Sequence, residues 1–206
     1  MLVCTGALLG VPAPAALAAF PVTGTTITGV EGSPAGGPLA TFTDLALTGC
    51  QPASYAATVT WPDGPATAAT VTTAGQNGLN CDYLVSGGHT FAEEGAQAFT
   101  VAVTSNGIGT GSGSGNGQAQ ISDAALHSAP VAAFSVPEAT TFGATIATFA
   151  DDDPGGAAGD YGATVAWGDG QSGPAVITVE AGGRFGVFAN HRYAQPGAYT
   201  ATVGIA

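Results

Sequence analysis

Few side chains in this sequence are suited to catalysis or to metal binding. Its three histidines are His89, His127 and His191, and its densest group of acids occupies residues 151–153. Imidazole is the usual general base near neutral pH, whereas several carboxylates in one loop are ligands that calcium prefers. The sequence therefore raises two chemistries, base catalysis at a histidine and calcium binding at the acidic loop.

His89 and His191 have the same strand parity as the apolar residues around them, such as Val85 and Val187. Alternate residues of a strand share one face, so both imidazoles are expected to lean toward a core and to bond to backbone near a strand end. A metal ligand or a catalytic base is the rival interpretation. Neither histidine has a nucleophile or a second ligand beside it in the sequence. His127 is expected to face solvent.

Asp151, Asp152 and Asp153 stand beside Pro154 and Gly155, which indicates a loop. Three consecutive aspartates cannot all point inward without help from other loops, and they do not match the spaced EF-hand pattern. A solvated turn is the main interpretation, and calcium is the alternative. No other cofactor is predicted.

The motifs of common enzymes do not occur. The sequence has no Gly-x-Ser-x-Gly elbow, no Walker loop, no His-Glu-x-x-His and no Cys-x-x-Cys. No catalytic residue is assigned, and the chain is predicted not to be an enzyme.

The elements that would position these residues are strands, and one strand occurs twice. Residues 55–64 and 161–170 each alternate Tyr, Ala, Val and Trp on one face and end in Asp-Gly, which suits a tight turn. Trp61 and Trp167 are 106 residues apart, and Glu31 and Glu138 are 107 apart. A nearly constant offset indicates an internal repeat.

Short strands separated by turn signals, without a helical period, predict an antiparallel β-sandwich for each copy. Phe99 and Tyr199, after Gly95 and Gly197, are placed at equivalent points of the last long strand, where a tyrosine can bond back to the backbone as in a tyrosine corner. The two tryptophans are assigned to the cores, with a sugar-stacking platform as the rival. The predicted core residues are Phe42, Tyr55, Trp61, His89, Phe99, Phe149, Tyr161, Trp167, His191 and Tyr199.

Cys50 and Cys81 form an even pair once Cys4 is set aside with the N-terminal segment. Two cysteines in an exported protein are expected to be bridged, and two unpaired buried thiols are the alternative. Both cysteines lie in the first copy, so the bridge would stabilise that copy alone and would not be part of the fold that the two copies share.

Composition and charge limit the partners. Fourteen acidic residues against two arginines and no lysine give a formal charge of −12. Binding to nucleic acid or to an anionic membrane surface requires clustered basic residues, so neither is expected. Residues 1–19 are apolar and end near a small-x-small pattern, which predicts a secretory signal too short and too proline-rich to span a bilayer. A disordered apolar arm is the alternative interpretation of this segment.

The chain is therefore divided into a signal at 1–19, a first module at 20–124 and a second at 125–206. The Gly/Ser-rich run 105–117 is interpreted as a floppy hairpin loop between the last two strands of the first module. The second module ends before any equivalent of the strand that follows this loop. An unpaired edge is expected there, in a fragment of a longer array or a prematurely ended sequence.

Residues 167–170 (Trp-Gly-Asp-Gly) together with residues 191–203 resemble the polycystic-kidney-disease (PKD) repeat. The first copy is a more divergent match, with Pro62 where the family has glycine. The resemblance implies immunoglobulin-like sandwiches of bacterial surface or secreted proteins, acting as extracellular spacers or adhesion modules toward a protein or polysaccharide ligand. The alternative is an accessory, substrate-positioning module of a secreted hydrolase whose catalytic domain is not in this chain.

Overall fold

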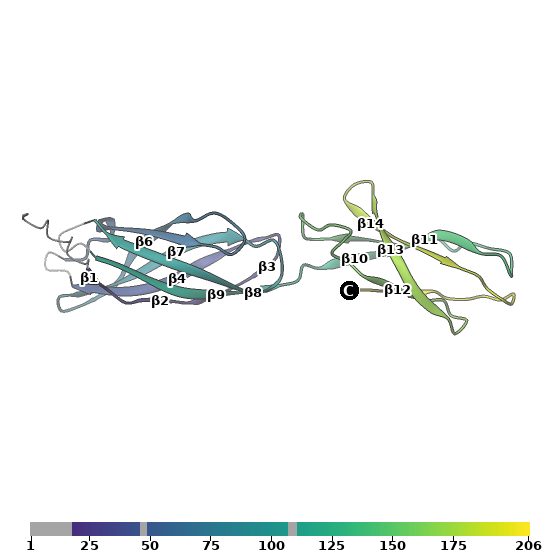
Figure 1. Ribbon diagram of the computed structural model, residues 1–206, viewed down its shortest axis with the longest axis horizontal. Helices are drawn as coiled ribbons and strands as arrows, with labels where there is room; N and C mark the ends of the chain where they lie inside the picture. The colour runs from purple at the N-terminus through teal and green to yellow at the C-terminus, as the bar shows by residue number, and fades with distance from the viewer. Residues whose placement is uncertain (1–17, 46–48, 107–110) are drawn as a thin grey trace, which may run out of the picture. The chain divides into compact units, whose positions relative to one another are not determined.

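The computed structural model describes residues 18–45, 49–106 and 111–206 (Figure 1). Within these residues the fold is all-β, and a single 3-10 turn, η1 (Pro52–Ser54), is the only helical element. None of the described residues forms a helix with the length and apolar character needed to cross a membrane. The predicted all-β class with antiparallel β-sandwiches is confirmed.

Nine strands form the first sheet, in the order β1-β9-β8-β5-β6-β7-β4-β2, with β3 paired to β9. Their bounds are β1 (Ala18–Ala19), β2 (Val22–Gly24), β3 (Thr26–Val30), β4 (Pro34–Leu45), β5 (Tyr55–Thr60), β6 (Thr67–Asn77), β7 (Asn80–Thr90), β8 (Gly95–Ser105) and β9 (Gly111–Ser122).

Strand β6 joins the two layers of this sandwich. Residues 67–69 pair with β5, and the later part of β6, from Thr70 to Asn77, pairs with β7. Alternate residues of β5, β7 and β8 are buried between the layers, as expected for strands with one face on a core. Phe42 of β4 contacts Tyr55 of β5, with ring centroids 5.0 Å apart.

Six strands form the second sheet, in the order β10-β11-β14-β13-β12-β15. Their bounds are β10 (Leu126–Pro130), β11 (Phe142–Asp151), β12 (Ala163–Ala166), β13 (Ser172–Glu180), β14 (Arg184–His191) and β15 (Thr202–Ile205). Strand β13 repeats the role of β6, since it pairs first with β12 and then with β14.

The core of the second sheet repeats the aromatic packing of the first. Phe149 of β11 contacts Tyr161, just before β12, with ring centroids 5.0 Å apart, and Phe185 of β14 at 5.1 Å. Val165, Val187 and Trp167 belong to the same buried cluster. Equivalent aromatic residues therefore hold the two layers together in both copies.

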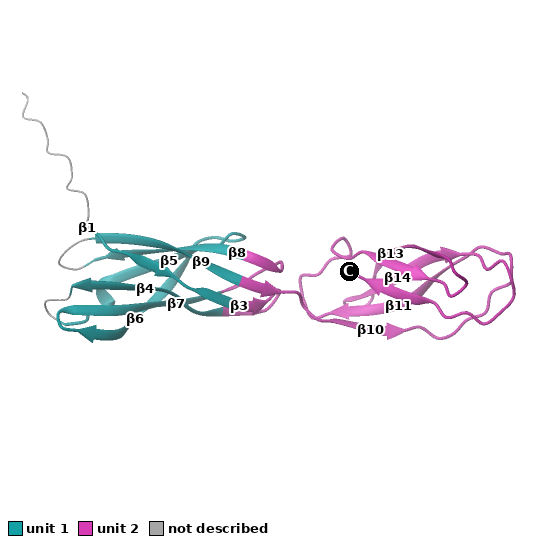
Figure 2. Ribbon diagram, turned by 90° about the horizontal axis from the view of Figure 1, so that it is seen from below, with its two compact units in different colours: residues 1–27, 36–88, 97–119 teal, residues 28–35, 89–96, 120–206 magenta. Residues whose placement is uncertain are grey.

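The chain divides into two compact units, drawn in different colours in Figure 2: Met1–Ile27 with Gly36–Gly88 and Gln97–Ala119, and Thr28–Ala35 with His89–Ala96 and Gln120–Ala206. This division groups the ends of several strands of the first sheet with the second unit. The predicted boundary between residues 124 and 125 stays a prediction. Most of the predicted signal segment 1–19 lies outside the described residues, and its last two residues form β1, which pairs in parallel with Gly111 and Ser112.

The Gly/Ser-rich run was expected to be a floppy loop, and from Gly111 onward this expectation is wrong. Residues 111–122 form β9, one of the longest strands of the sheet. A Cβ added to Gly113 would lie 2.2 Å from the Phe20 carbonyl oxygen, and one added to Gly115 would lie 2.2 Å from that of Val22. These glycines permit close backbone approach, a role that composition alone does not distinguish from flexibility.

Candidate functional site

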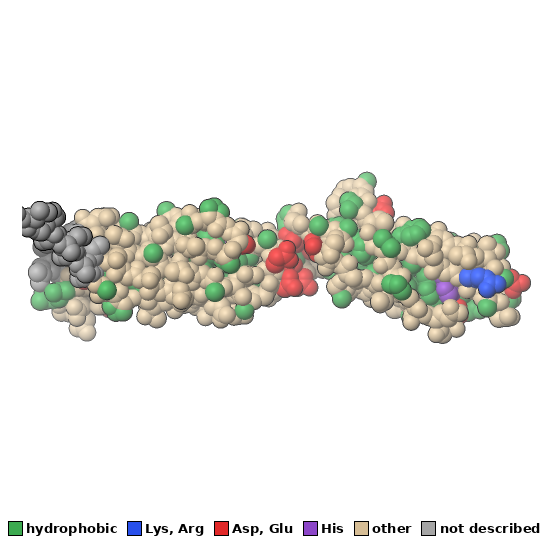
Figure 3. All heavy atoms as spheres, in the orientation of Figure 1, with side chains coloured by type: hydrophobic (Ala, Val, Ile, Leu, Met, Phe, Trp, Pro, Cys, Tyr) green, Lys and Arg blue, Asp and Glu red, His purple; other side chains and the backbone are tan. Residues whose placement is uncertain are grey.

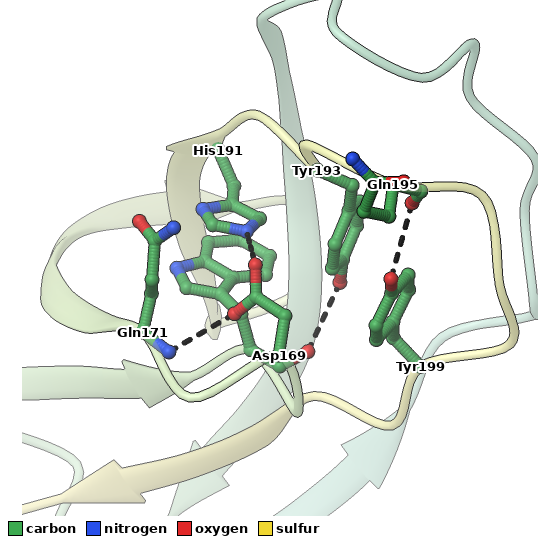
Figure 4. Close-up of polar contacts among 7 residues, drawn as sticks. Asp169, Gln171, His191, Tyr193, Gln195 and Tyr199 are labelled. Carbon is green, nitrogen blue, oxygen red and sulfur yellow. Dashed lines mark hydrogen bonds and ion pairs between the residues drawn. The ribbon is translucent and has the colours of Figure 1, made fainter.

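The strongest grouping of reactive side chains lies around Trp167 in the second copy. The turn after β12 places Asp169, and the end of β14 places His191 beside it. Gly168 and Gly170 have φ angles of 82° and 88°, so the Trp-Gly-Asp-Gly turn requires glycine at both points. We call Trp167, Asp169, His191, Tyr193 and Tyr199 the Trp167 cluster (Figure 4).

His191 is fixed by one hydrogen bond and one ring stack. Its Nε2 lies 3.0 Å from Oδ2 of Asp169, and its ring stacks on Trp167 with centroids 4.5 Å apart and planes 6° from parallel. His191 is 8% exposed and Trp167 is 3% exposed. The imidazole is thus held in one orientation with little access to solvent.

The Asp169 carboxylate also holds the turn, since its Oδ1 accepts the Gln171 amide at 3.0 Å. Burial disfavours the charged form, but the bonds from the Gln171 amide and from His191 outweigh it and lower the pKa of Asp169 below its ordinary value. The pair is therefore a structural clamp between the turn and the end of β14.

Two tyrosines complete the cluster. The Tyr193 hydroxyl donates to the Trp167 carbonyl at 3.2 Å, and the Tyr199 hydroxyl donates to the Gln195 carbonyl at 3.1 Å. The second bond is the local return to backbone that a tyrosine corner makes. The two rings stack with centroids 4.4 Å apart. Tyr193 was not singled out from the sequence, although it shares the parity of His191 two residues earlier.

A histidine paired with an aspartate is half of a nucleophilic triad, so the chemistry of the cluster must be considered. Among the described residues, no hydrogen bond joins His191 to a serine, threonine or cysteine side chain. Its Nε2 already faces Asp169, and one ring face is covered by Trp167. The arrangement positions two loops and brings no nucleophile to the imidazole.

The strand pairing corrects one predicted equivalence. Val101 pairs with Val59 in the first copy, and Val203 pairs with Val165 in the second. This register makes Ala201, and not Tyr199, the counterpart of Phe99. Phe99 is fully buried and contacts Trp61 with ring centroids 5.2 Å apart, whereas Ala201 is exposed. The prediction erred because it aligned aromatic residues after a glycine, and the turns differ in length.

The three aspartates of the acidic loop, residues 151–153, contact different partners. Asp151 accepts the Tyr161 hydroxyl at 2.7 Å and the Asp153 amide at 2.8 Å. Asp152 lies 3.0 Å from the exposed His127, and Asp153 accepts the Gly155 amide at 2.9 Å. Each aspartate thus has a local partner, and calcium at this loop stays a prediction.

A different acidic group gathers beside the last residues of β9. Carboxylate oxygens of Glu31, Glu93 and Glu94 lie within 4.8 Å of one another. Glu31 is buried and accepts the Ala124 amide at 3.0 Å. Burial raises the pKa of Glu31, and the carboxyl groups of Asp123 and Glu94 act in the same direction. Sequence reasoning missed this group because its members come from distant segments.

The remaining predicted residues lie at the sandwich cores or beside them. Phe42 and Phe149 are buried, whereas Tyr55, Tyr161 and His89 are half-buried. Cys50 and Cys81 form a disulfide with their Cα atoms 5.5 Å apart, which confirms the bridge. The face shown in Figure 3 has basic side chains in a single small area and apolar side chains in scattered spots.

Comparison with known proteins gives distant likenesses. No family model and no curated protein matches the chain. A crystal structure of an ICAM-5 ectodomain fragment matches at 15% identity and a TM-score of 0.43, over 87% of this chain and 47% of that chain. An endo-fucoidan hydrolase of glycoside hydrolase family 107 matches at 16% identity and a TM-score of 0.29, over 95% of this chain and 28% of that chain.

The chain thus spans less than half the length of either structure. Neither likeness is close enough to bear on function.

Proposed function

We propose that this chain consists of two PKD-like modules that serve as a non-catalytic extracellular spacer or binding scaffold. One observation carries the proposal: the side chains suited to chemistry are engaged in holding strands and turns. The imidazole of His191 clamps the Asp169 turn, and the carboxylate of Asp151 anchors Tyr161. A scaffold needs such rigid supports, whereas a catalytic base needs a reacting partner within reach.

The disulfide supports the extracellular part of the proposal. Bridges such as Cys50–Cys81 form and persist in oxidising compartments and are rare in the cytosol. The apolar segment 1–19 is the proposed export signal.

Expression of the full chain in a bacterial host with a functional secretion pathway tests the export. We expect protein outside the cytoplasm, an N-terminus near Ala19, and no free thiol in the unfolded, unreduced protein. A chain lacking residues 1–19 is the control and should stay in the cytoplasm with reduced cysteines. Retention of the full chain, uncleaved and reduced, would contradict the proposal.

The non-catalytic part has its own test. Purified protein is incubated with panels of polysaccharides and peptides, and product formation is followed. No turnover is expected. A turnover that His191→Gln abolishes, while the variant keeps its folded circular dichroism spectrum, would show that the Trp167 cluster is an active site.

A further inference from the structure

A half-buried phenylalanine, Phe188, lies on the outer face of the second copy. Its neighbours along β14, Phe185, Val187 and Ala189, are buried and belong to the core cluster. Because side chains of a strand alternate between faces, Phe188 and Asn190 lie on the side away from the core. Strand β14 has β11 on one side and β13 on the other (Figure 1). The ring is therefore presented by the face of the sheet and not by an edge.

The strands on either side complete a surface around this ring. Phe188 pairs with Val176 of β13 and with Thr145 of β11. Asn190 pairs with Gly143 of β11. The Phe188 ring extends over β11, since its Cζ would lie 2.9 Å from a Cβ on Gly143, and the Asn190 side-chain oxygen lies over the same glycine. We call Gly143, Thr145, Val176, Phe188 and Asn190 the Phe188 platform.

The platform combines apolar surface with polar groups that the protein does not use. Val176 is 62% exposed, and Asn190 is also exposed. Among the residues that the structure describes, no hydrogen bond engages the Thr145 hydroxyl or the Asn190 amide. A ligand that stacks on the ring can therefore also form hydrogen bonds beside it. Apolar surface with a few polar groups around it is the usual composition of a small-molecule site.

The first copy shows that the fold does not require this surface. The separation of 106 residues between the two tryptophans relates Val176 to Thr70, and the separation of 102 between His89 and His191 relates Phe188 to Ser86. Thr70 and Ser86 are themselves register partners, as Val176 and Phe188 are. The outer face of one copy thus has two hydroxyls where the other has two apolar side chains. Packing of the sandwich does not explain this difference.

The charges on the same face indicate the class of ligand. The nearest charged residues on β13 and β14 are Glu180 and Arg184, which are register partners of opposite sign. Arg184 donates to the Thr148 hydroxyl at 3.1 Å, and Arg192, just beyond β14, donates to the Ala139 carbonyl at 2.7 Å. Both arginines are thus engaged by the protein, and the chain as a whole has a formal charge of −12. A polyanion finds no attraction here, so an uncharged ligand fits best.

We propose that the Phe188 platform binds a neutral polysaccharide, with one sugar ring stacked on Phe188 and its hydroxyl groups bonded to Thr145 and Asn190. A sugar ring has apolar faces and a polar rim, which match an aromatic ring beside a free hydroxyl and a free amide. The inference rests on the proposed role as a binding scaffold and names the class of its partner.

Two other occupants fit less well. A peptide that adds a strand needs an open edge, and the main chain of β14 is paired on both sides. A second copy of this chain would need an interface of about 1,000 Å² or more, and Val176 and Phe188 are only two apolar side chains. The like charges of two copies would also oppose their association.

Native electrophoresis of the full chain in gels that contain a dissolved polysaccharide tests the proposal. The neutral probes are hydroxyethyl cellulose, arabinoxylan, laminarin and galactomannan, and the polyanion alginate is the contrast. We expect at least one neutral probe, and not alginate, to retard the protein. Phe188→Ala should weaken this binding by about tenfold or more, whereas Phe188→Tyr should keep it. Asn190→Ala should weaken it by about three- to tenfold, the usual effect of one lost hydrogen bond.

Two variants are matched controls. Phe134→Ala removes another phenylalanine of the second copy, which is 50% exposed, and Ser86→Ala changes the equivalent position of the first copy. Both should bind like the unsubstituted chain, and circular dichroism checks that every variant is folded. No retardation by any neutral probe, binding unchanged by Phe188→Ala, or equal losses for Phe188→Ala and Phe134→Ala would overturn the proposal. Concentration-dependent dimers that Phe188→Ala dissociates would also overturn it, in favour of self-association.

Failure of this inference can be told apart from failure of the proposed function. Export and disulfide formation do not depend on the platform, so an exported, bridged chain that binds none of the neutral probes would lose the platform alone. A chain that is retained in the cytoplasm, yet is retarded in a Phe188-dependent way, would lose the extracellular role and keep the sugar site. Turnover of a probe is read separately through His191→Gln.

Discussion

At the residue scale, the same tyrosine–aspartate pair recurs in both copies. The Tyr55 hydroxyl donates to Asp44 at 2.8 Å, and the Tyr161 hydroxyl donates to Asp151 at 2.7 Å. In both tyrosines burial and the neighbouring carboxylate raise the pKa of the phenol above its ordinary value. Each pair ties the end of one strand, β4 or β11, to a tyrosine at the start of β5 or just before β12, so the aspartates are structural.

Removal of one of these hydroxyls should therefore destabilise its copy. Tyr161→Phe is expected to lower the free energy of unfolding by about 1.5–3 kcal/mol, the usual range for a hydrogen bond to a charged group. Urea denaturation followed by tryptophan fluorescence measures it. Tyr199→Phe is the matched control and should cost about 0.5 kcal/mol or less, because its bond to the Gln195 carbonyl is exposed. Equal costs for both variants would contradict the structural role of the pair.

Glu31 gives a prediction for pH. Burial raises its pKa above the ordinary 4.5, so the folded protein binds this proton more tightly than the unfolded chain does. The associated stability is fully present below the ordinary value and is lost as the pH rises through the raised one. Glu31→Gln keeps an acceptor for the Ala124 amide and removes the ionisation. Relative to the unsubstituted protein, the variant should gain stability as the pH rises above the ordinary value of 4.5, until the pH has passed the raised pKa of Glu31.

The urea midpoints of both proteins at several pH values measure this difference. Glu138→Gln is the control, because Glu138 is exposed at the corresponding place in the second copy. A constant difference between Glu31→Gln and the unsubstituted protein across the pH range would show that Glu31 does not titrate as its burial implies.

At the element scale, the disulfide joins the segment before β5 to the start of β7 and closes a span of 31 residues. The chain-entropy account assigns such a loop about 3–4 kcal/mol. Reduction should lower the free energy of unfolding of the first copy by about this amount and leave the second copy unchanged. Denaturation with and without reductant measures it. Reductant should not change the unfolding of a chain that carries Cys50→Ala and Cys81→Ala. A change in that chain would show that the stability lost on reduction does not come from the disulfide.

Strand β9 is sensitive to side chains at its glycines. Because a Cβ on Gly115 would meet the carbonyl oxygen of Val22, Gly115→Ala should force the backbones apart. The expected cost is about 1–3 kcal/mol, as for overpacked sites. Ser114→Ala, at an exposed neighbouring position, should change stability by about 0.5 kcal/mol or less. The same urea midpoint for both variants would contradict the close approach of the β9 backbone to the Val22 carbonyl at Gly115.

At the scale of the whole molecule, the two copies differ in how completely their cores are covered. The first has the 12-residue strand β9 and a disulfide, whereas the last strand of the second, β15, has four residues. We therefore expect two unfolding transitions, with the second copy unfolding first. Trp61→Phe leaves Trp167 as the probe, and Trp167→Phe leaves Trp61, so the two single-tryptophan chains report the copies separately. Coincident transitions in urea would contradict this order.

The sequence alone determined the period of the fold and its repeated landmarks. Alternation of apolar residues predicts half-buried strands because side chains of a strand alternate between faces. In the structure, the side chains of Trp61, Trp167, Phe42 and Phe149 are buried. Glu31, Asp44 and Trp61 recur 106 or 107 residues later as Glu138, Asp151 and Trp167, and this nearly constant spacing indicated the repeat from the sequence alone. The disulfide between Cys50 and Cys81 was predictable because these are the two cysteines that remain once Cys4 is set aside with the N-terminal segment.

Only the tertiary structure decided which strands are neighbours. The pairing register makes Ala201 the counterpart of Phe99. Gly111–Ser122, most of which is rich in glycine and serine, is the strand β9. Glu31, Glu93 and Glu94 come from distant segments and lie close together in the fold. These arrangements depend on hydrogen bonds between segments far apart in the sequence and on turn lengths, which local composition does not predict.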